Sequence, residues 1–388
     1  MCKSQLWSQV TAMSDKGMAR KPLTYSSAGV DIDLANQALK RIKPIIKTTY
    51  RSEVLKDIGG FGGLFSFPSD KFSDPVLVAS TDGVGTKAQI ARQVGRLDTI
   101  GIDLVAMCLD DLVCEGAEPL FMLDYIAAGY MQPDHIEQLV SGIVKGCLQA
   151  GCALIGGELA EHRDVMGMDE FDLAGFAVGV VERNDILGSE LVSVGDKVIG
   201  IFSDGLRCNG YSLARKVLLS DSNLQTPSET LKRPAWKGAT HCLADELLKP
   251  SLIYSPGIVK VKKALNHDEG SLAASSATPV SEKSLHAVAH ITGGGIEGNL
   301  SRVLPNGLDA VLRRSKWPVP LIFGEIQRLG SVSDDEMEKI FNLGLGMIMI
   351  VDPKSTDFAL KTINDCGFEA SLVGEITAGD GKVTVLDE

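Results

Sequence analysis

The stretch that decides the fold class reads Val76-Leu-Val-Ala-Ser-Thr-Asp-Gly-Val-Gly-Thr-Lys87. Its first five residues predict a short buried strand, and the glycines after them predict a tight turn. The glycine spacing fits neither the P-loop nor the dinucleotide-binding fingerprint. The residue types nevertheless suit a nucleotide, because Gly83 and Gly85 would let the backbone come close. Asp82 could hold a metal ion and Lys87 could meet a phosphate. A plain strand-to-helix turn with a surface lysine is an equally good interpretation of this segment.

Helices and strands alternate on both sides of this stretch. Helices are predicted over residues 31–46, 102–112, 133–149, 209–219 and 297–303, and strands over 120–125, 153–157, 171–181, 197–203, 308–312, 347–351, 370–375 and 383–386. Short links join many of the strands, so both an α+β fold and a mixed-sheet α/β fold stay open at this stage.

A polar, glycine-containing segment from Gly188 to Asp196 predicts a domain boundary. The prediction is a poorly ordered leader over residues 1–24, an N-terminal domain over 25–187 and a C-terminal domain over 196–388. Two polar or Ser/Ala-rich stretches in the second half, residues 221–240 and 267–283, predict surface loops.

Composition limits the classes of protein that this chain can belong to. A length of 388 residues is enough for two hydrophobic cores. The chain has 50 acidic and 38 basic residues, so its net charge of −12 gives no general attraction to nucleic acid or anionic lipid. No stretch approaches the roughly 18 apolar residues of a membrane span, and the N-terminus lacks a secretory signal. The eight cysteines form no CxxC pair, which favours buried reduced thiols in a cytoplasmic protein.

Three acids in the segment after the glycine turn are candidate ligands of a metal ion. Asp103 and Asp110 are two helical turns apart and share a stripe away from the apolar face, while Asp111 is offset by one position. Carboxylates near a phosphate site suit Mg²⁺. A solvated helix face would show the same spacing.

Two further glycine loops are candidate ligand sites. The segment from Asp57 to Gly63, with Gly60 and Gly62 inside it, could fold over a phosphate, or it could be a flexible linker. The segment Ala289-His-Ile-Thr-Gly-Gly-Gly-Ile296 precedes a predicted helix, where backbone N–H groups favour an anion. His290 could bind substrate or move a proton there, although a lone histidine is more often structural.

These motifs occur in order along most of the chain, from Tyr25 to Val351. The landmarks are Ala28-Gly-Val-Asp-Ile-Asp33, Gly59-Gly-Phe-Gly-Gly63, Thr81-Asp-Gly-Val-Gly-Thr-Lys87, Thr99-Ile-Gly-Ile-Asp-Leu-Val-Ala-Met107, Gly116-Ala-Glu-Pro-Leu-Phe121, Asn209-Gly-Tyr-Ser-Leu213, Ala289-His-Ile-Thr-Gly-Gly-Gly295 and Val303-Leu-Pro305. Taken together they resemble the phosphoribosylformylglycinamidine cyclo-ligase (AIR synthetase) family. Any single landmark would be weak, but this many in order are specific.

The resemblance implies an α+β fold with two domains: an N-terminal mixed sheet that pairs across a homodimer, and a C-terminal α+β sandwich. It implies ATP-dependent closure of the imidazole ring of formylglycinamidine ribotide, with Mg²⁺. ATP would phosphorylate the formyl oxygen, a neighbouring nitrogen would attack, and phosphate would leave. No nucleic-acid or membrane partner is expected.

The resemblance and the loop chemistry together predict the site residues. The predicted catalytic groups are Asp82, His290 and Lys43. The predicted metal ligands are Asp82, Asp110 and Asp111. The predicted ATP contacts are Gly60, Gly62, Gly83, Gly85, Lys87, Asp111, Thr292, Gly293 and Gly294. The predicted substrate contacts are Arg207, Asn209 and Glu158.

The chain departs from the family pattern at a few positions. The family usually reads Ser-Ser-Gly-x-His-Ser-Asn-Gly where this chain reads Ser203-Asp-Gly-Leu-Arg-Cys-Asn-Gly210, so Asp204, Arg207 and Cys208 differ. Leu159 replaces a usual threonine and Leu252 a usual arginine. We expect Arg207 to bind a phosphate, with a surface role on a tolerant loop as the alternative. The departures leave open a drifted nucleotide-binding homologue without activity, or another ATP-using relative of the superfamily.

Overall fold

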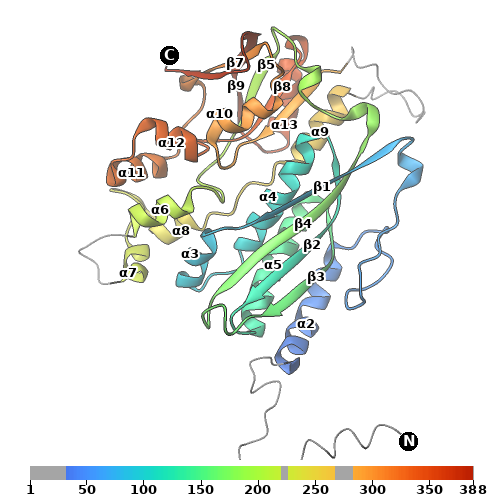
Figure 1. Cartoon of the computed structure of the whole chain (residues 1–388), viewed down its shortest axis with the longest axis vertical. Helices are drawn as coiled ribbons and strands as arrows, with labels where there is room; N and C mark the ends of the chain where they lie inside the picture. Colours follow the sequence, from blue (N-terminus) through green and yellow to red (C-terminus); the bar gives the residue numbers. More distant parts are fainter. Residues whose placement is uncertain (1–31, 220–225, 267–282, 388) are drawn as a thin grey trace, which may run out of the picture.

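The computed structural model describes residues 32–219, 226–266 and 283–387, and its strands form two mixed sheets (Figure 1). The strands are β1 (Pro75–Gly83), β2 (Glu118–Ala128), β3 (Ala153–Glu161), β4 (Phe171–Glu182), β5 (Lys197–Phe202), β6 (Leu285–His290), β7 (Leu308–Arg313), β8 (Leu345–Val351), β9 (Ala370–Ala378) and β10 (Val383–Leu386). The first sheet has the order β1-β4-β2-β3 and the second β10-β7-β9-β5-β8-β6. Among the strands of the described residues, the pairs β2–β3 and β10–β7 are parallel and the others are antiparallel. The predicted α+β fold with mixed sheets is therefore confirmed.

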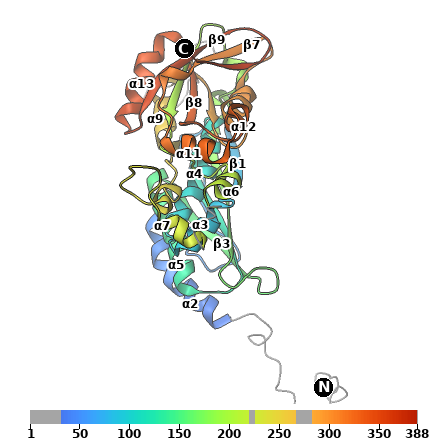
Figure 2. The same ribbon diagram turned by 90° about the vertical axis from the view of Figure 1, so that its left-hand side faces the viewer.

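Helices cover one face of the first sheet and both faces of the second. The helices are α2 (Ile32–Ile46), α3 (Lys87–Val94), α4 (Ile100–Cys114), α5 (Pro133–Ala150), α6 (Tyr211–Leu218), α7 (Pro227–Lys232), α8 (Leu243–Leu247), α9 (Ser255–Asn266), α10 (Gly295–Leu300), α11 (Leu321–Gly330), α12 (Asp334–Ile340) and α13 (Thr356–Asp365). Helices α2, α4 and α5 lie on the same face of the first sheet (Figure 2). Helices α9 and α13 share one core cluster of the second sheet, and α10 belongs to the other.

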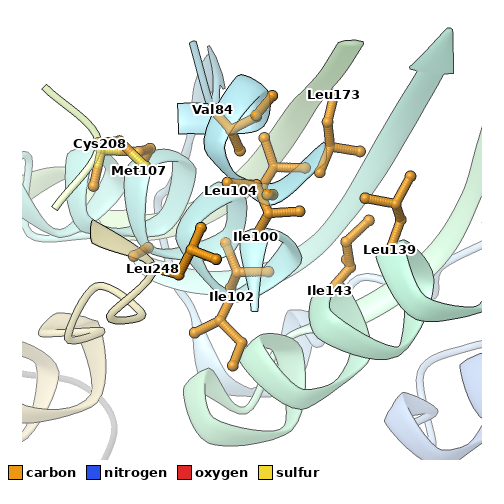
Figure 3. Close-up of a cluster of buried hydrophobic side chains, with 14 of the residues drawn as sticks. Val84, Ile100, Ile102, Leu104, Met107, Leu139, Ile143, Leu173, Cys208 and Leu248 are labelled. Atoms are coloured by element: carbon orange, nitrogen blue, oxygen red, sulfur yellow. The ribbon is translucent and has the colours of Figure 1, made fainter. Parts of the chain in front are cut away.

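Helix α4 is the central element of the molecule, because it contacts β1 and β4 of the first sheet and β6 of the second. Nearly every residue from Ile100 to Val113 is buried. A Cβ atom at Gly101 would lie 2.2 Å from the backbone nitrogen of Ile143, so only glycine lets α4 and α5 approach this closely. The resulting core joins side chains of α4, α5, β4 and the loops around Cys208 and Leu248 (Figure 3).

One hydrophobic cluster thus contains residues on both sides of the predicted domain boundary, from Ala38 to Phe341. The chain crosses that boundary through two short 3-10 turns, Arg183–Asp185 and Ser189–Leu191. The division at residues 188–195 stays a prediction. The predicted leader lies outside the described residues.

The predicted loop over residues 221–240 is wrong in part, because α7 lies inside it. The reason is a capping box that a search for apolar periodicity misses: Thr226 accepts from the backbone N–H of Glu229, and the Glu229 side chain accepts from the N–H of Thr226. Residues 267–282 of the second predicted loop lie outside the described part of the chain. Each predicted strand and helix corresponds to an observed one to within a few residues, which is the usual uncertainty of element ends. The helices α3, α8, α9, α11, α12 and α13 and the strand β6 were not predicted.

Two predictions from composition can be compared with the structure. All seven cysteines of the described part, Cys108 to Cys366, are free thiols. Across the described ranges no helix combines the length and the apolar character that a membrane crossing requires.

Candidate active site

Three predicted site residues from distant parts of the chain meet where the two sheets join. Asp82 ends β1, Asp111 lies on α4, and His290 ends β6. His290 Nδ1 lies 2.7 Å from Asp111 Oδ1. Ser80 Oγ donates to the other oxygen, Asp111 Oδ2, at 3.2 Å. The backbone N–H of Gly83 donates to Asp82 Oδ1 at 2.7 Å. We call Ser80, Asp82, Asp111 and His290 the acid–histidine cluster.

The two carboxylates of the cluster have pKa values that move in opposite directions. Burial raises the pKa of Asp82, and the nearby charge of Asp111 adds to the increase. Burial would also raise the pKa of Asp111, but the hydrogen bond and charge of His290 and the bond from Ser80 outweigh it, so the pKa is lowered. Asp111 is therefore the group that stays ionised.

His290 has one ring nitrogen committed and one available. The Asp111 carboxylate can only accept, so it holds the proton on Nδ1 and leaves Nε2 of the neutral ring as an acceptor. Nε2 is buried and has no hydrogen-bond partner among the described residues. A buried acceptor held in a fixed orientation can take a proton from a bound ligand.

Asp110 and Arg207 form a buried ion pair with each other. Asp110 Oδ2 accepts from Arg207 at 2.7 Å, and Asp110 Oδ1 accepts from the N–H groups of Tyr254 and Ser255 at 2.8 and 2.9 Å. Arg207 is only 4% exposed. The Asp110 side chain is 0% exposed and fully surrounded by these donors, which argues against its predicted role as a metal ligand, whereas the Asp111 side chain is 44% exposed. The surface alternative for Arg207 is wrong.

Lys87, the first residue of α3, forms a second buried ion pair with Asp103 on α4. Its Nζ lies 2.8 Å from the Asp103 carboxylate and 2.6 Å from the carbonyl oxygen of Lys249, and the side chains of Lys87 and Asp103 are both 0% exposed. Ser251 donates to Asp103 through its N–H and its hydroxyl. This geometry directs Lys87 at protein acceptors and not at the nucleotide phosphate of the prediction.

Lys43 and the glycine segment 59–63 lie together near β3, the edge strand of the first sheet opposite β1. A Cβ atom at Gly59 would lie 2.9 Å from Lys43 Nζ, and one at Gly63 would lie 2.7 Å from the carbonyl oxygen of Ile155 on β3. Gly60 and Gly62 belong to this segment, and the exposed Glu158 is on the same strand, opposite Tyr125. Strands β1 and β3 are the two edges of the sheet. Within one chain, this group is thus separate from Asp82.

The loop after His290 is held close to Asn209. Asn299 Nδ2 donates to the carbonyl oxygens of Thr292, Gly293 and Gly295, which fixes the loop. A Cβ atom at Gly293 would lie 3.7 Å from Asn209 Nδ2. Gly294 has φ +102°, a conformation that glycine adopts without strain. Asn209 and the loop that directly follows His290 therefore lie side by side. On the β1 side, the predicted contacts Gly83 and Gly85 follow Asp82 directly.

Asp124, an acid in the middle of β2, is not among the predicted site residues. Asp82 and Asp124 are both register partners of Gly175, so they lie on the same face of the sheet, two strands apart. Burial raises the pKa of Asp124 to about 7. A Cβ atom at Gly157 would lie 1.7 Å from Asp124 Oδ1, so a glycine is required beside it. The available signal was an acid at an inward position between the apolar residues Met122 and Ile126.

Family models match both halves of the chain: "AIR synthase related protein, N-terminal domain" over residues 71–181 and "AIR synthase related protein, C-terminal domain" over 268–387. Curated proteins match nearly the whole chain. A phosphoribosylformylglycinamidine cyclo-ligase of Syntrophus aciditrophicus is 45% identical over 95% of this chain and 99% of its own length, and one of Geotalea daltonii is 47% identical over the same shares. The chain belongs to the phosphoribosylformylglycinamidine cyclo-ligase family. A cyclo-ligase of Myxococcus xanthus, 46% identical over 94% and 98% of the two chains, is a further relative.

Two solved structures with the same fold carry other names than cyclo-ligase. Thiamine-monophosphate kinase from Stenotrophomonas maltophilia covers 92% of this chain and 97% of its own, with a TM-score of 0.62 and 18% identity. Hydrogenase maturation protein HypE in complex with ATP covers 91% and 89%, with a TM-score of 0.55 and 15% identity. At such identities the likeness shows the fold alone. The cyclo-ligase family thus shares its architecture with other enzymes, and the residues of the site must carry the chemistry.

Proposed function

We propose that this chain converts formylglycinamidine ribotide and ATP to aminoimidazole ribotide, ADP and phosphate, a ring closure in purine biosynthesis. The observation that carries the proposal is 43–47% identity, over 92–96% of the chain, to relatives named for this activity. The chain is an enzyme of this family, and the acid–histidine cluster keeps its reactive groups together. A drifted homologue without activity is therefore not favoured.

The chemical problem is a formyl oxygen that leaves its carbon poorly. In the first step the formyl oxygen attacks the γ-phosphorus of ATP, an O–P bond forms, and the bond to the β-phosphate oxygen breaks to give ADP. In the second step a neighbouring nitrogen attacks the formyl carbon, the C–O bond breaks, and phosphate leaves. A proton must leave the attacking nitrogen. The enzyme's contribution is orientation, proton transfer and charge neutralisation.

His290 is our candidate for the proton acceptor. Its Nε2 is the free acceptor of the cluster, and the 2.7 Å contact with Asp111 holds the ring in one orientation. Asp111 would also stabilise the charged ring after the proton has moved, because its lowered pKa keeps it ionised. The loop Thr292–Gly294 and Asn209 would bind the reactants next to this nitrogen.

Asp82 and Asp111 would hold Mg²⁺. No group of three or more His, Cys, Asp or Glu side chains in the described part of the chain is arranged for a metal ion. Mg²⁺ is usually bound by one or two carboxylates together with substrate phosphates and water, which fits two carboxylates and the Ser80 hydroxyl. The ion supplies neutralisation of phosphate charge when bound. Use of ATP is supported by the structure of HypE, which has the same fold and was determined with ATP.

We expect the purified chain to form aminoimidazole ribotide, ADP and phosphate in equal amounts from formylglycinamidine ribotide, ATP and Mg²⁺. The variant Asp82→Asn should turn over about 100-fold more slowly, since loss of one group that stabilises transition-state charge costs about that factor. Its melting temperature should stay near that of the wild type, because Asp82 is only partly buried at a strand end. ADP release that does not depend on the ribotide would overturn the proposal.

We further propose a cytoplasmic homodimer formed through the uncovered face of the first sheet. Leu77 on β1, Phe176 on β4 and Tyr125 on β2 are 62%, 41% and 42% exposed. Register pairs place these strands side by side, so the exposed side chains share one apolar face. A second copy of the chain would cover it, since a sheet with one bare apolar face gains from pairing. The free thiols support a reducing compartment.

Phe176→Glu should convert the dimer to a monomer, because it places a charge at the centre of the proposed interface. Sedimentation equilibrium should give about the 41.3 kDa mass of one chain for the variant and twice that mass for the wild type. Leu148→Glu is the matched control, as Leu148 is also an exposed apolar residue but lies on α5, away from the uncovered face. A wild-type monomer, or an unchanged mass for Phe176→Glu, would contradict the proposed interface.

A further inference from the structure

The buried side chain of Arg207 donates hydrogen bonds to three different segments of the protein. It lies in the loop between β5 and α6. Its Nη2 donates to Asp110 Oδ2 at 2.7 Å and to the carbonyl oxygen of Leu252 at 3.2 Å. Its Nη1 donates to the carbonyl oxygen of Gly346 on β8 at 3.1 Å. The guanidinium also lies over the Tyr254 ring, 4.7 Å from its centroid.

Two of these acceptors are directly connected to the acid–histidine cluster. Asp110 precedes Asp111 on α4. The carbonyl oxygen of Gly346 also accepts from the N–H of Ile291 at 3.0 Å, and Ile291 follows His290. One guanidinium therefore holds the neighbour of Asp111 on one side and, through Gly346, the neighbour of His290 on the other.

We propose that Arg207 is a positioning residue, which sets the distance and orientation between Asp111 and His290. This role rests on the proposed function. Asp111 lies on α4, which packs on the first sheet, and His290 ends β6 of the second sheet, so their 2.7 Å contact depends on how α4 packs against β6. In addition to the contact between Asp111 and His290, Arg207 links α4 to the second sheet, because it donates to Asp110 on α4 and to Gly346 on β8.

An arginine suits this positioning role better than a lysine. Its planar fork directs Nη1 and Nη2 at two acceptors in fixed directions, whereas a lysine ammonium is a single point on a flexible stem. The backbone of Arg207 has φ 60°, in the left-handed region that side chains other than glycine rarely adopt. Such a conformation persists where the surroundings hold the residue firmly.

The contacts argue against direct phosphate binding by Arg207. Both terminal nitrogens donate to protein acceptors, and the remaining nitrogen, Nε, is buried without a partner among the described residues. A phosphate would have to displace Asp110, whose other oxygen is held by two backbone N–H groups. The guanidinium of Arg207 is thus fully occupied by acceptors in the protein interior.

The test is a comparison of steady-state kinetics for Arg207→Met and Arg207→Lys. Arg207→Met should lower kcat about 100-fold, the scale of loss for reactive groups displaced by about 1 Å. KM for ATP and for the ribotide should stay within about two-fold, because no contact with either is removed. Arg207→Lys should recover part of kcat, and it also serves if Arg207→Met fails to fold. Wild-type kcat in either variant, or a raised KM with an unchanged kcat, would overturn the proposal.

A matched control separates positioning from general stabilisation. Arg314 also stacks on an aromatic ring, 4.2 Å from the Trp317 centroid, and donates to the carbonyl oxygen of Trp317. Among the described residues it forms no hydrogen bond or ion pair with α4 or β6. Arg314→Lys should lower the melting temperature without changing kcat.

A spectroscopic readout keeps the proposal distinct from the proposed function. In protein with ¹⁵N-labelled histidine, the Nδ1 proton that His290 shares with Asp111 should give a low-field resonance, identified by its loss in His290→Gln. Arg207→Met should shift or remove this resonance even if the wild-type enzyme forms no product, in which case only the proposed function fails. An unchanged resonance in a folded Arg207→Met variant would refute the positioning role.

Discussion

His290→Gln is expected to lower kcat by about two to four orders of magnitude, the range in which removal of a general acid–base group falls. Glutamine has neither the ring nitrogen that faces the reactants nor the basicity to take a proton. The folded enzyme should still bind ATP, so KM for ATP should change far less than kcat. Steady-state assays of product formation at several ATP concentrations would measure both constants.

The chain offers a matched control four residues away on the same strand. His286 Nδ1 also lies 2.7 Å from a carboxylate, Asp196 Oδ2, but its Nε2 is occupied by the carbonyl oxygen of Lys283. His286→Gln should therefore leave kcat of the folded enzyme unchanged and act on stability alone. Equal losses of kcat in the two variants would show that His290 matters for folding and not for proton transfer.

The stability effect of the control depends on pH in a defined direction. Burial lowers the pKa of His286, but the hydrogen bond and charge of Asp196 outweigh it and hold the pKa above the usual value of about 6.5. A raised folded-state pKa gives stabilisation that is fully present below the unfolded value and is lost as pH rises through the folded value. His286→Gln should thus cost more stability at acidic than at alkaline pH.

The strand and the glycine turn around Asp82 were predictable because their signals are local. A run of apolar residues makes a strand, and glycines allow the turn, whatever the rest of the chain does. The landmark order added the family, and with it the joint presence of Asp82, Asp111 and His290. Their meeting at one place was not visible in any spacing, since Asp82 lies on β1 of the first sheet, Asp111 on α4 and His290 on β6 of the second sheet.

The roles of the acids on α4 could not be read from spacing. The stripe of Asp103 and Asp110 predicted metal ligands or a solvated helix face, yet both side chains are buried and bind Ser251, Tyr254 and neighbouring groups more than 140 residues later. Asp111, one position and about 100° further round the helix, faces the cluster instead. Such an assignment depends on which segment folds onto each face, which local periodicity does not contain.

Lys87→Met is expected to destabilise the fold by about 3–5 kcal/mol, the cost of removing one partner of a buried ion pair. The Asp103 carboxylate would remain fully buried, with Ser251 as its remaining donor. Chemical denaturation would measure the change in the free energy of unfolding. The double variant Lys87→Met/Asp103→Asn should recover part of the loss, because it leaves no uncompensated charge.

The same variant decides between the buried pair and the predicted phosphate contact of Lys87. Loss of a phosphate-binding cation would raise KM for ATP and leave stability nearly unchanged. Loss of the buried pair would instead lower stability and leave KM for ATP nearly unchanged in the fraction that folds.

Lys145→Met is the control for a solvent-exposed pair: Lys145 lies 3.2 Å from Asp98, and both side chains are about half exposed. It should cost no more than about 1 kcal/mol, since water screens such pairs. Comparable destabilisation by Lys145→Met and Lys87→Met would mean that burial does not govern the contribution of Lys87.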